Sequence, residues 1–202
     1  MKWKCGGFVQ ILTMPVGAYQ TNCYMVCGEE DTCVLVDPGY QATAILEQVQ
    51  KRGMQVKAIL LTHGHFDHVG AVRDIVADTD CDVYICEKEL SLPETFTAGK
   101  LYYTHTYGEG DTVTAAGLTF DILHTPGHTP GSVCLLCGNV MFSGDTLFAG
   151  SCGRTDLPGG DWNTIQTSLR RLAELSGDYR VFPGHGEDTS LDFERKTNPY
   201  LR

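Results

Sequence analysis

Short apolar runs separated by turn residues dominate the first part of the chain. The runs at 8–14, 22–27 and 33–36 are rich in β-branched residues and predict three consecutive strands. Apolar residues then recur at helical spacing over 42–49, and Gly53 follows as a helix stop. This pattern predicts a surface helix with one apolar stripe.

A continuous apolar run follows at 56–61. It has the length of a strand and no alternation, which is typical of a strand buried on both faces, and it leads directly into Thr62 and His63. A second helix is expected from about residue 69, and another short strand at 83–86. The segment 93–111 has little periodicity and predicts a long loop.

The second half begins with another set of strand patterns. Clean alternation at 118–122 predicts a strand. The runs 132–137 and 140–142 predict a hairpin that turns at Gly138 and Asn139.

The C-terminal part adds a helix and a last strand. Asp161 is a suitable N-cap for a helix that Gly177 ends, a short strand is expected at 180–182, and 191–201 forms at most a short helix. Because strands with inserted helices recur in both halves, we expect two packed sheets flanked by helices.

Length and charge narrow the class of protein. The 202 residues suffice for a core without disulfides, and we expect a single domain over residues 1–202. A formal net charge of −10 argues against a nucleic-acid partner, because binding to phosphates needs clustered Lys and Arg. No apolar run reaches the length of a membrane span, and the start of the chain is too short and polar for a secretory leader. We expect a soluble protein without membrane contact.

The nine cysteines are an odd number scattered through the chain, which fits reduced thiols and predicts a cytoplasmic location. Cys134 and Cys137 have the spacing of a redox pair, but they lie in a run that predicts a strand. Positions three apart in a strand face opposite sides. We therefore interpret both as buried thiols.

One short segment concentrates side chains that bind metals. His63, His65, Asp67 and His68 lie between a predicted buried strand and a helix. Imidazole and carboxylate groups are ligands that Zn²⁺, Fe and Mn accept. Gly64 is expected to let the backbone bend so that the two flanking rings converge. A single capping Asp would suffice to begin a helix, so the three histidines indicate a metal site.

Three further candidates each follow a glycine at or near the end of a predicted strand: His128, Asp145 and His185. In sheet-based α/β proteins, sites gather at strand ends, where loops converge above a rigid sheet. A single Pro-Gly turn would carry little information. Three such segments, joined to the histidine cluster, predict one site built from distant parts of the chain.

Five motifs resemble the metallo-β-lactamase fold superfamily, and within it the compact single-domain hydrolases of the glyoxalase II (hydroxyacylglutathione hydrolase) type. They are Val36-Asp37-Pro38-Gly39, Thr62-His63-Gly64-His65-Phe66-Asp67-His68, His124-Thr125-Pro126-Gly127-His128-Thr129-Pro130-Gly131-Ser132, Phe142-Ser143-Gly144-Asp145-Thr146 and Phe182-Pro183-Gly184-His185-Gly186. The resemblance covers nearly the whole chain. It implies the α/β class and an αββα sandwich, with two packed mixed β-sheets flanked by helices.

The resemblance also implies a ligand set. Carried over by position, one metal ion is held by His63, His65 and His128, and a second by Asp67, His68 and His185, with Asp145 bridging the two. Asp67 and Asp145 would also orient the attacking hydroxide. The set contains only nitrogen and oxygen ligands, so two divalent ions are expected, Zn²⁺ first, with Fe or Mn as alternatives.

Such a site suits hydrolysis of a small-molecule acyl-thiol. Two divalent ions that share one water lower its pKa enough to supply hydroxide near neutral pH, and one ion polarises the substrate carbonyl. A thioester such as S-lactoylglutathione is a natural substrate because the second ion stabilises the departing thiolate. An ester or a lactone would use the same groups.

Two more positions have competing interpretations. Asp37 ends a predicted buried strand and is either the partner of a ligand histidine or part of a plain Asp-Pro-Gly turn. The stretch Cys152-Gly153-Arg154 resembles a segment that lines the substrate site in glyoxalase II-like enzymes and in persulfide dioxygenases. Arg154 is the expected contact for a carboxylate of the thiol, with a solvated surface arginine as the alternative.

The aromatic stretch from Tyr102 to Tyr107 can line a substrate pocket, pack the predicted long loop against the body of the protein, or cover an oligomer contact. His105 and His124 match no ligand position and are interpreted as structural.

Three functions remain open at this point. The first is a dinuclear thioester or ester hydrolase, although we expect no C-terminal helical domain of the kind that supplies basic residues for glutathione in two-domain glyoxalase II proteins. The second is a mononuclear iron persulfide dioxygenase, whose family uses the equivalents of His63, His128 and Asp145 only. The third is a metal-binding module without catalysis, which the complete ligand set disfavours.

Overall fold

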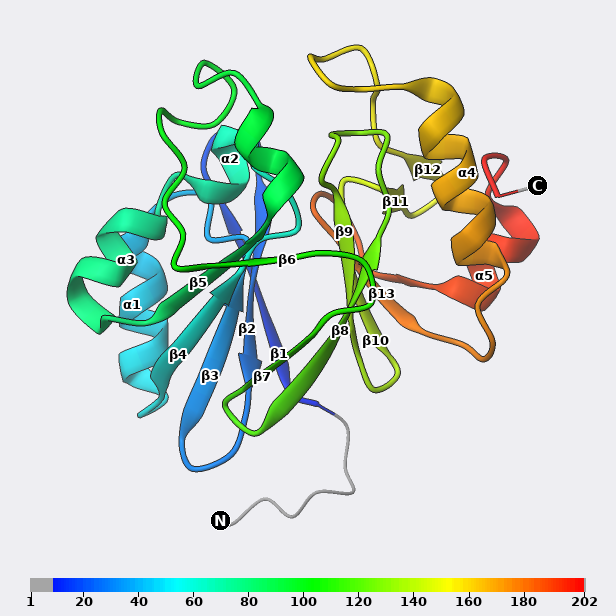
Figure 1. Cartoon of the computed structure of the whole chain (residues 1–202). Helices are drawn as coiled ribbons and strands as arrows, with labels where there is room; N and C mark the ends of the chain where they lie inside the picture. The colour runs from blue at the N-terminus through cyan, green and yellow to red at the C-terminus, as the bar shows by residue number, and fades with distance from the viewer. Residues whose placement is uncertain (1–8, 202) are drawn as a thin grey trace.

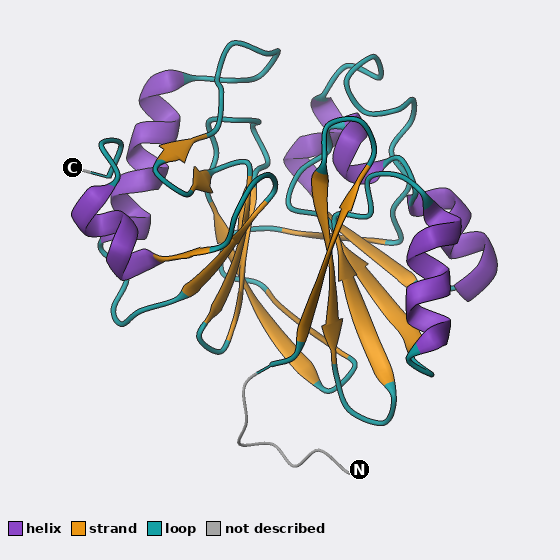
Figure 2. Cartoon of the chain, turned by 180° about the vertical axis from the view of Figure 1, so that it is seen from behind, coloured by secondary structure: helices purple, strands orange, loops and turns teal. Residues whose placement is uncertain are grey.

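Two six-stranded sheets face each other in the computed structural model (Figure 1). Helices α1 (Ala42–Lys51) and α3 (Val72–Thr79) cover the outer face of one sheet (Figure 1). Helices α4 (Trp162–Ala173) and α5 (Leu191–Thr197) cover the outer face of the other, as the view from behind also shows (Figure 2). The predicted αββα sandwich is confirmed.

The structure describes residues 9–201. The beginning of the first predicted strand and the segment tested as a secretory leader lie partly or wholly outside these residues. No helix within 9–201 is long and apolar enough to cross a bilayer.

The first sheet has the strand order β1-β2-β3-β4-β5-β6. Its strands are β1 (Ile11–Val16), β2 (Thr21–Cys27), β3 (Thr32–Val36), β4 (Gln55–Leu60), β5 (Asp82–Cys86) and β6 (His105–Tyr107). Strands β1 to β3 pair antiparallel, and β3 to β6 run parallel. A parallel neighbour can be reached only by a crossover, and α1 and α3 supply two of these crossovers.

The second sheet has the order β14-β13-β10-β9-β8-β7. Its strands are β7 (Thr112–Ala115), β8 (Leu118–His124), β9 (Val133–Cys137), β10 (Val140–Gly144), β13 (Arg180–Pro183) and β14 (Thr189–Ser190). Only β10 and β13 pair in parallel, and α4 is the crossover between them. The predicted β9–β10 hairpin is confirmed. A small hairpin of β11 (Leu147–Phe148) and β12 (Ser151–Cys152), which the pattern did not predict, follows β10.

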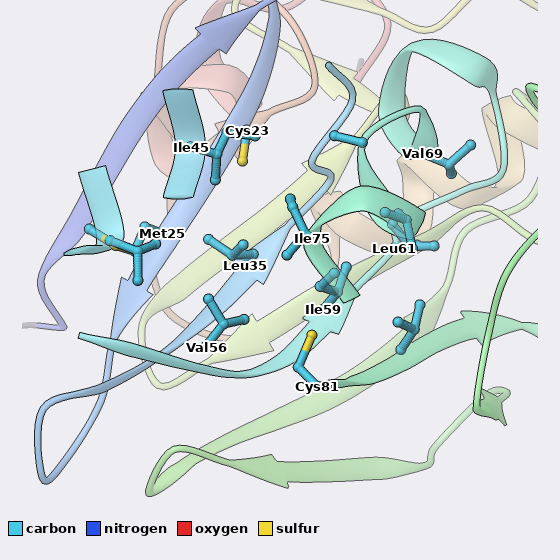
Figure 3. Close-up of a cluster of buried hydrophobic side chains, with 14 of the residues drawn as sticks. Cys23, Met25, Leu35, Ile45, Val56, Ile59, Leu61, Val69, Ile75 and Cys81 are labelled. Carbon is cyan, nitrogen blue, oxygen red and sulfur yellow. The ribbon is translucent and has the colours of Figure 1, made fainter. Parts of the chain in front are cut away.

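Three apolar layers hold the sandwich together. One lies between α1, α3 and the first sheet, where Figure 3 shows Ile45 and Ile75 of the helices beside Leu35 and Ile59 of the strands. A second fills the space between the sheets, and a third joins the second sheet to α4 and α5. Asp161 caps α4 as predicted, with its side chain accepting a hydrogen bond from the N–H of Thr164, 2.7 Å away.

The prediction of an uninterrupted loop over 93–111 is wrong at its end. The last part forms β6, which pairs in parallel with β5, and β7 then begins in the other sheet without having been predicted. Both are edge strands, and β6 has three residues. So short a strand has too few positions for a period-two pattern, and pairing with a neighbour decides its conformation.

The helix expected from about residue 69 is α3, which begins at Val72, and the structure adds a short helix before it that was not predicted. Helix α2 (Phe66–Val69) ends before α3 begins. Between them, the N–H of Ala71 donates to the carbonyl oxygen of Pro38 at 3.0 Å. A Cβ at Gly70 would lie 2.4 Å from the carbonyl oxygen of Gly39. Glycine at position 70 therefore allows the loop after β3 to approach the junction between α2 and α3.

The two cysteines with redox-pair spacing face opposite sides of β9, as predicted. Cys134 packs in the layer beneath α4, and Cys137 packs between the sheets. Burial raises the pKa of the Cys134 thiol to about 12. Among the described residues both are free thiols, so they do not form a redox pair in this fold.

Truncation of Phe142 tests the packing between the sheets. Its side chain is fully buried, and its ring centroid lies 5.2 Å from that of Tyr24 on the facing sheet. We expect Phe142→Ala to lower the free energy of unfolding by about 3–5 kcal/mol, because the lost contacts leave a cavity. Chemical denaturation measures this change. Phe193→Ala is the control: this side chain is 58% exposed, and a loss of more than about 0.5 kcal/mol is not expected. Equal losses would contradict the assigned core.

Candidate metal centre

The predicted ligands lie at one end of the sandwich, where strands of both sheets finish. Asp37 follows β3 and His63 follows β4, and these two strands are parallel, so their ends share an edge. Asp145 and His185 follow β10 and β13, which are also parallel. His128 lies in the loop between β8 and β9. The fold therefore delivers side chains from distant parts of the sequence to one place.

The structure forms two groups that could each hold a metal ion. Within each group, ligand atoms lie within 4.8 Å of one another. The first group is His63, His65 and His128, and the second is Asp67, His68 and His185. These are the two sets that the resemblance implies. The same distance criterion also admits Asp37 with His63 and His68, because Asp37 lies directly behind the second group.

Asp145 lies between the two groups. Its Oδ2 atom is 3.5 Å from Nε2 of His128 in the first group and 3.6 Å from Nε2 of His185 in the second. Its Oδ1 atom is 3.5 Å from Nε2 of His68. A carboxylate in this position can share its two oxygens between two cations.

Most of the rings have one nitrogen held by the protein and the other directed at the site. Nδ1 of His68 lies 3.0 Å from Oδ2 of Asp37, and Nδ1 of His128 lies 2.8 Å from the carbonyl oxygen of Arg154. Nδ1 of His185 lies 3.1 Å from the carbonyl oxygen of Tyr19. An acceptor at Nδ1 keeps the proton there, so Nε2 carries the free lone pair that a metal needs.

His65 is arranged differently. Its Nδ1 atom lies 2.9 Å from Nε2 of His128, so these two ring nitrogens face each other. At this separation either one nitrogen donates a proton to the other or both direct lone pairs at a shared cation.

The test of whether these residues fit a metal is the state of their buried polar atoms. Among the described residues, four buried atoms of the site have no hydrogen-bond partner: Nε2 of His63, His65 and His68, and Oδ1 of Asp145. Buried polar atoms without a partner are rare in folded proteins. Nitrogen and oxygen donors gathered in this way fit divalent cations such as Zn²⁺, Fe or Mn.

In the first group the rings are neutral at pH 7. Burial lowers the pKa of His63, His65 and His128 below the ordinary value of a histidine, and for His65 to about 4. A neutral imidazole is the form that binds a metal, so this group is ready to do so without losing protons.

The second group is more strongly influenced by carboxylates. Burial lowers the pKa of His68, but Asp145, Asp37 and Asp67 outweigh it and raise that pKa to about 9. The pKa of His185 is also raised, with burial opposed by its contacts to Asp67 and Asp145. The same carboxylates would attract a divalent cation, which would replace the protons on these rings.

The contacts of Asp37 favour its interpretation as the partner of a candidate ligand histidine over that of a plain turn residue. Its Oδ1 accepts a hydrogen bond from the N–H of Thr62 at 2.7 Å, and its Oδ2 accepts one from the hydroxyl of Thr62 at 2.6 Å. Oδ2 also lies 3.0 Å from Nδ1 of His68. The side chain is 2% exposed, so these contacts stabilise a carboxylate that would otherwise be costly to bury.

Sequence reasoning missed several residues that hold the candidate ligands in place. The hydroxyl of Thr21, which is fully buried, donates to Oδ2 of Asp67 at 2.9 Å. The carbonyl groups of Tyr19 and Arg154 orient His185 and His128 through main-chain atoms. Every residue carries a carbonyl, so no side-chain pattern could have revealed these two contacts.

Gly64 does not use the left-handed backbone region that is open to glycine, so its expected role in a bend stays a prediction. A Cβ there would instead lie 3.0 Å from Oε2 of Glu89, so the glycine permits a close approach. Gly184 has a similar purpose, because a Cβ at that position would lie 2.1 Å from Oδ1 of Asp145.

The Cys152-Gly153-Arg154 segment adjoins the site through its main chain. A Cβ at Gly153 would lie 1.8 Å from the carbonyl oxygen of Asp145. Cys152 is half-buried on β12. The guanidinium of Arg154 is exposed and is bonded to both carboxylate oxygens of Asp156, at 2.7 and 2.6 Å. The predicted anion contact therefore has an internal partner that a substrate would have to displace.

The aromatic stretch mainly packs against the body of the protein. Tyr107 is 3% exposed, and its hydroxyl donates to the carbonyl oxygen of Leu61. Tyr102 packs on the apolar layer beneath α3, with the guanidinium of Arg73 over its ring. His124 bonds the carbonyl oxygen of Pro130, as a structural histidine would.

The αββα sandwich and the His/Asp cluster at its strand ends define a metallo-hydrolase. The chain matches the metallo-β-lactamase superfamily over residues 16–185 and belongs to that superfamily. It is 35% identical over 211 residues to the hydroxyacylglutathione hydrolase GloC of Haemophilus influenzae, which covers 96% of this chain and 98% of that relative.

Two solved structures show the same fold at similar length. The B3 metallo-β-lactamase BLEG-1 superposes with a TM-score of 0.89 at 33% identity, covering 95% of this chain and 99% of the other. The protein TTHA1623, in a di-iron-bound form, superposes with a TM-score of 0.84 at 40% identity, covering 94% and 100%. This fold therefore occurs in a di-iron-bound form and in a protein named as a B3 metallo-β-lactamase.

Replacement of Asp37 tests its role behind His68. We expect Asp37→Asn to weaken the binding of one metal equivalent about 10- to 100-fold, because the amide no longer offers two acceptor oxygens to Thr62 and His68. Competition between the protein and a chelating dye for Zn²⁺ measures the affinity. Asp121→Asn is the control, since Asp121 is exposed on β8 and bonds only Thr112 in the described contacts. Unchanged affinity in Asp37→Asn would return Asp37 to the role of a turn residue.

Proposed function

We propose that this protein is a dinuclear metal-dependent hydrolase that cleaves a thioester such as S-lactoylglutathione or a related acyl-thiol or ester. One observation carries the proposal: the carboxylate of Asp145 lies within 3.6 Å of ring nitrogens from both His-containing groups. A mononuclear site would need only one of the groups. Two three-residue groups on either side of one carboxylate support a pair of cations.

In this proposal His63, His65 and His128 hold one ion, and Asp67, His68 and His185 hold the other, with Asp145 shared. The ions supply, when bound, an activated water and a Lewis acid for the substrate carbonyl. Asp67 is kept ionised and oriented by the hydroxyl of Thr21 and by His185, and its pKa is held well below its ordinary value. Asp67 and Asp145 can therefore accept hydrogen bonds from a bound water and fix its direction.

The identity of the substrate rests on two supports. The relative from Haemophilus influenzae is named a hydroxyacylglutathione hydrolase and aligns along nearly its whole length. The exposed Arg154, beside half-buried Cys152 and Gly153, offers a planar cation for a carboxylate of the thiol. Zn²⁺ is the metal proposed first. Fe is the alternative that the di-iron form of TTHA1623 favours, and Mn fits the same donors.

Removal of the shared carboxylate tests the proposed function. We expect Asp145→Ala to abolish hydrolysis of S-lactoylglutathione and to reduce the metal content, because the carboxylate proposed as a ligand shared by both metal ions is lost. Activity is followed by release of free thiol, and metal by elemental analysis of the wild type and the variant. Asp121→Ala, on the exposed side of β8, is the control and is expected to keep both properties.

Metal content and activity of the wild type also distinguish between the candidate functions. About two metal ions per chain with thioester cleavage supports the proposal. One iron per chain with oxygen consumption on glutathione persulfide would replace it with the persulfide dioxygenase. Unchanged rate and metal content in Asp145→Ala would show that the site has been assigned to the wrong residues.

Substitution of Arg154 tests the proposed anion contact. We expect Arg154→Ala to raise KM for an anionic thioester more than it lowers kcat, as for a lost binding interaction. Asp156→Asn should lower KM, because the guanidinium is then free of its exposed ion pair, which is weak in water. Steady-state kinetics measure both, with Arg52→Ala at the end of α1 as the control. An unaltered KM in Arg154→Ala would leave this arginine a surface residue.

A further inference from the structure

Glu89 is a fully buried carboxylate that the proposed function does not use. It lies in the short 3₁₀ helix Glu87–Ser91, between β5 and the segment that leads to β6, and its relative exposure is 0%. Glutamate is seldom buried so completely unless a specific set of partners surrounds it. Its partners therefore indicate what it does.

The two oxygens of Glu89 reach two different loops of the candidate metal centre. Oε2 accepts a hydrogen bond from the N–H of Gly64 at 2.5 Å. Oε1 accepts hydrogen bonds from the hydroxyl of Thr129 at 2.7 Å and from the N–H of Gly131 at 2.6 Å. Gly64 stands between His63 and His65, and Thr129 follows His128. One side chain thus joins the loops that carry all three members of the first group.

Glycine at both main-chain contacts makes this approach possible. A Cβ on Gly64 would lie 3.0 Å from Oε2 of Glu89, and a Cβ on Gly131 would lie 2.7 Å from Oε1. A side chain at Gly131 would therefore displace the carboxylate or the loop. Glycine therefore stands at both main-chain positions that the two oxygens of Glu89 approach.

The chemistry of these contacts requires two acceptor oxygens. Each oxygen faces a main-chain N–H, which can only donate. An amide has one acceptor oxygen and one donor nitrogen, so glutamine in the same place would turn an NH₂ group toward one of the two N–H groups. Burial raises the pKa of the Glu89 carboxyl, and its three hydrogen bonds act in the opposite direction.

We propose that Glu89 is a positioning residue that fixes the His63–His65 turn relative to His128, and so sets the affinity of the first group for its metal ion. The inference rests on the proposed metal function. Glu89 touches none of the three imidazoles, and it acts through the main chain on either side of them. Residues that orient ligands from behind in this way typically change metal affinity about 10- to 100-fold when replaced.

A second buried glutamate provides a matched control. Glu194 in α5 is also 0% exposed and accepts hydrogen bonds from the hydroxyl of Thr189 at 2.7 Å, the N–H of Gly150 at 2.8 Å and the amide of Asn198 at 2.8 Å. None of these three partners is adjacent in sequence to a residue of either His-containing group. Its replacement costs the same kind of buried contact without touching the two loops that Glu89 joins.

The experiment compares Glu89→Gln, Glu194→Gln and the wild type after removal of metal by a chelator. Near-UV circular dichroism verifies folding, and each protein is then titrated with Co²⁺ while the visible absorption of the bound ion is recorded. We expect Glu89→Gln to bind one of two equivalents at least about tenfold more weakly, with an altered Co²⁺ spectrum, while the other equivalent is unchanged. Glu194→Gln should lower the thermal midpoint and bind Co²⁺ as the wild type does.

The possible results lead to different conclusions. Wild-type Co²⁺ affinity and spectrum in Glu89→Gln would overturn the inference and leave the proposed function standing. A wild type that binds no Co²⁺ would overturn both. If Glu89→Gln does not fold, Thr129→Val removes one hydroxyl bond to the same carboxylate, and a smaller weakening at the same equivalent is then expected. Unchanged binding in a folded Thr129→Val would also overturn the inference.

Discussion

Keeping carboxylates and imidazoles together out of water is the constraint on which the rest of the structure depends. An ionised carboxylate is stable in a buried place only when donors or cations replace its hydration. Asp37 has Thr62 and His68 for this purpose, and Asp67 has Thr21. The rings left with an unpartnered buried nitrogen complete the arrangement only with an added cation. The loops at this end of the sandwich must therefore hold their positions to within the range of a hydrogen bond.

The apolar layers bring the loops of the site close together, but they do not determine the exact positions of the ligand side chains. They fix the two sheets against each other and against the helices, so that the ends of β3, β4, β10 and β13 occupy one region. Hydrogen bonds between the loops and the candidate ligands then fix the final positions of the ligand atoms. Tyr24 links the two levels, because its ring packs on Phe142 while its hydroxyl donates to the carbonyl oxygen of Pro183, two residues before His185. One side chain of the core thus also positions the loop that carries His185.

The sequence predicted the sandwich and the candidate ligands because their chemistry is concentrated locally. Three imidazoles within the segment 63–68 and three Gly-His or Gly-Asp strand ends are visible without a structure. The groups behind them could not be predicted. Thr21 and Glu89 are distant in sequence from the groups that they contact, and nothing in the sequence distinguishes them from other threonines and glutamates. The edge strands β6 and β7 were missed for a related reason, since pairing with a neighbour rather than local periodicity forms them.

The main chain and the side chain of Arg154 make separate contacts, one at the candidate metal centre and one in solvent. Its carbonyl oxygen accepts a hydrogen bond from Nδ1 of His128, whereas its guanidinium is exposed and paired with Asp156. The first contact belongs to the main chain and survives any substitution that preserves the path of the loop. The second belongs to a side chain in water, where the ion pair is weak and easily exchanged. If the proposed function holds, a change of residue at this position can therefore alter how the thiol part of the substrate binds while His128 keeps its tautomer and its direction.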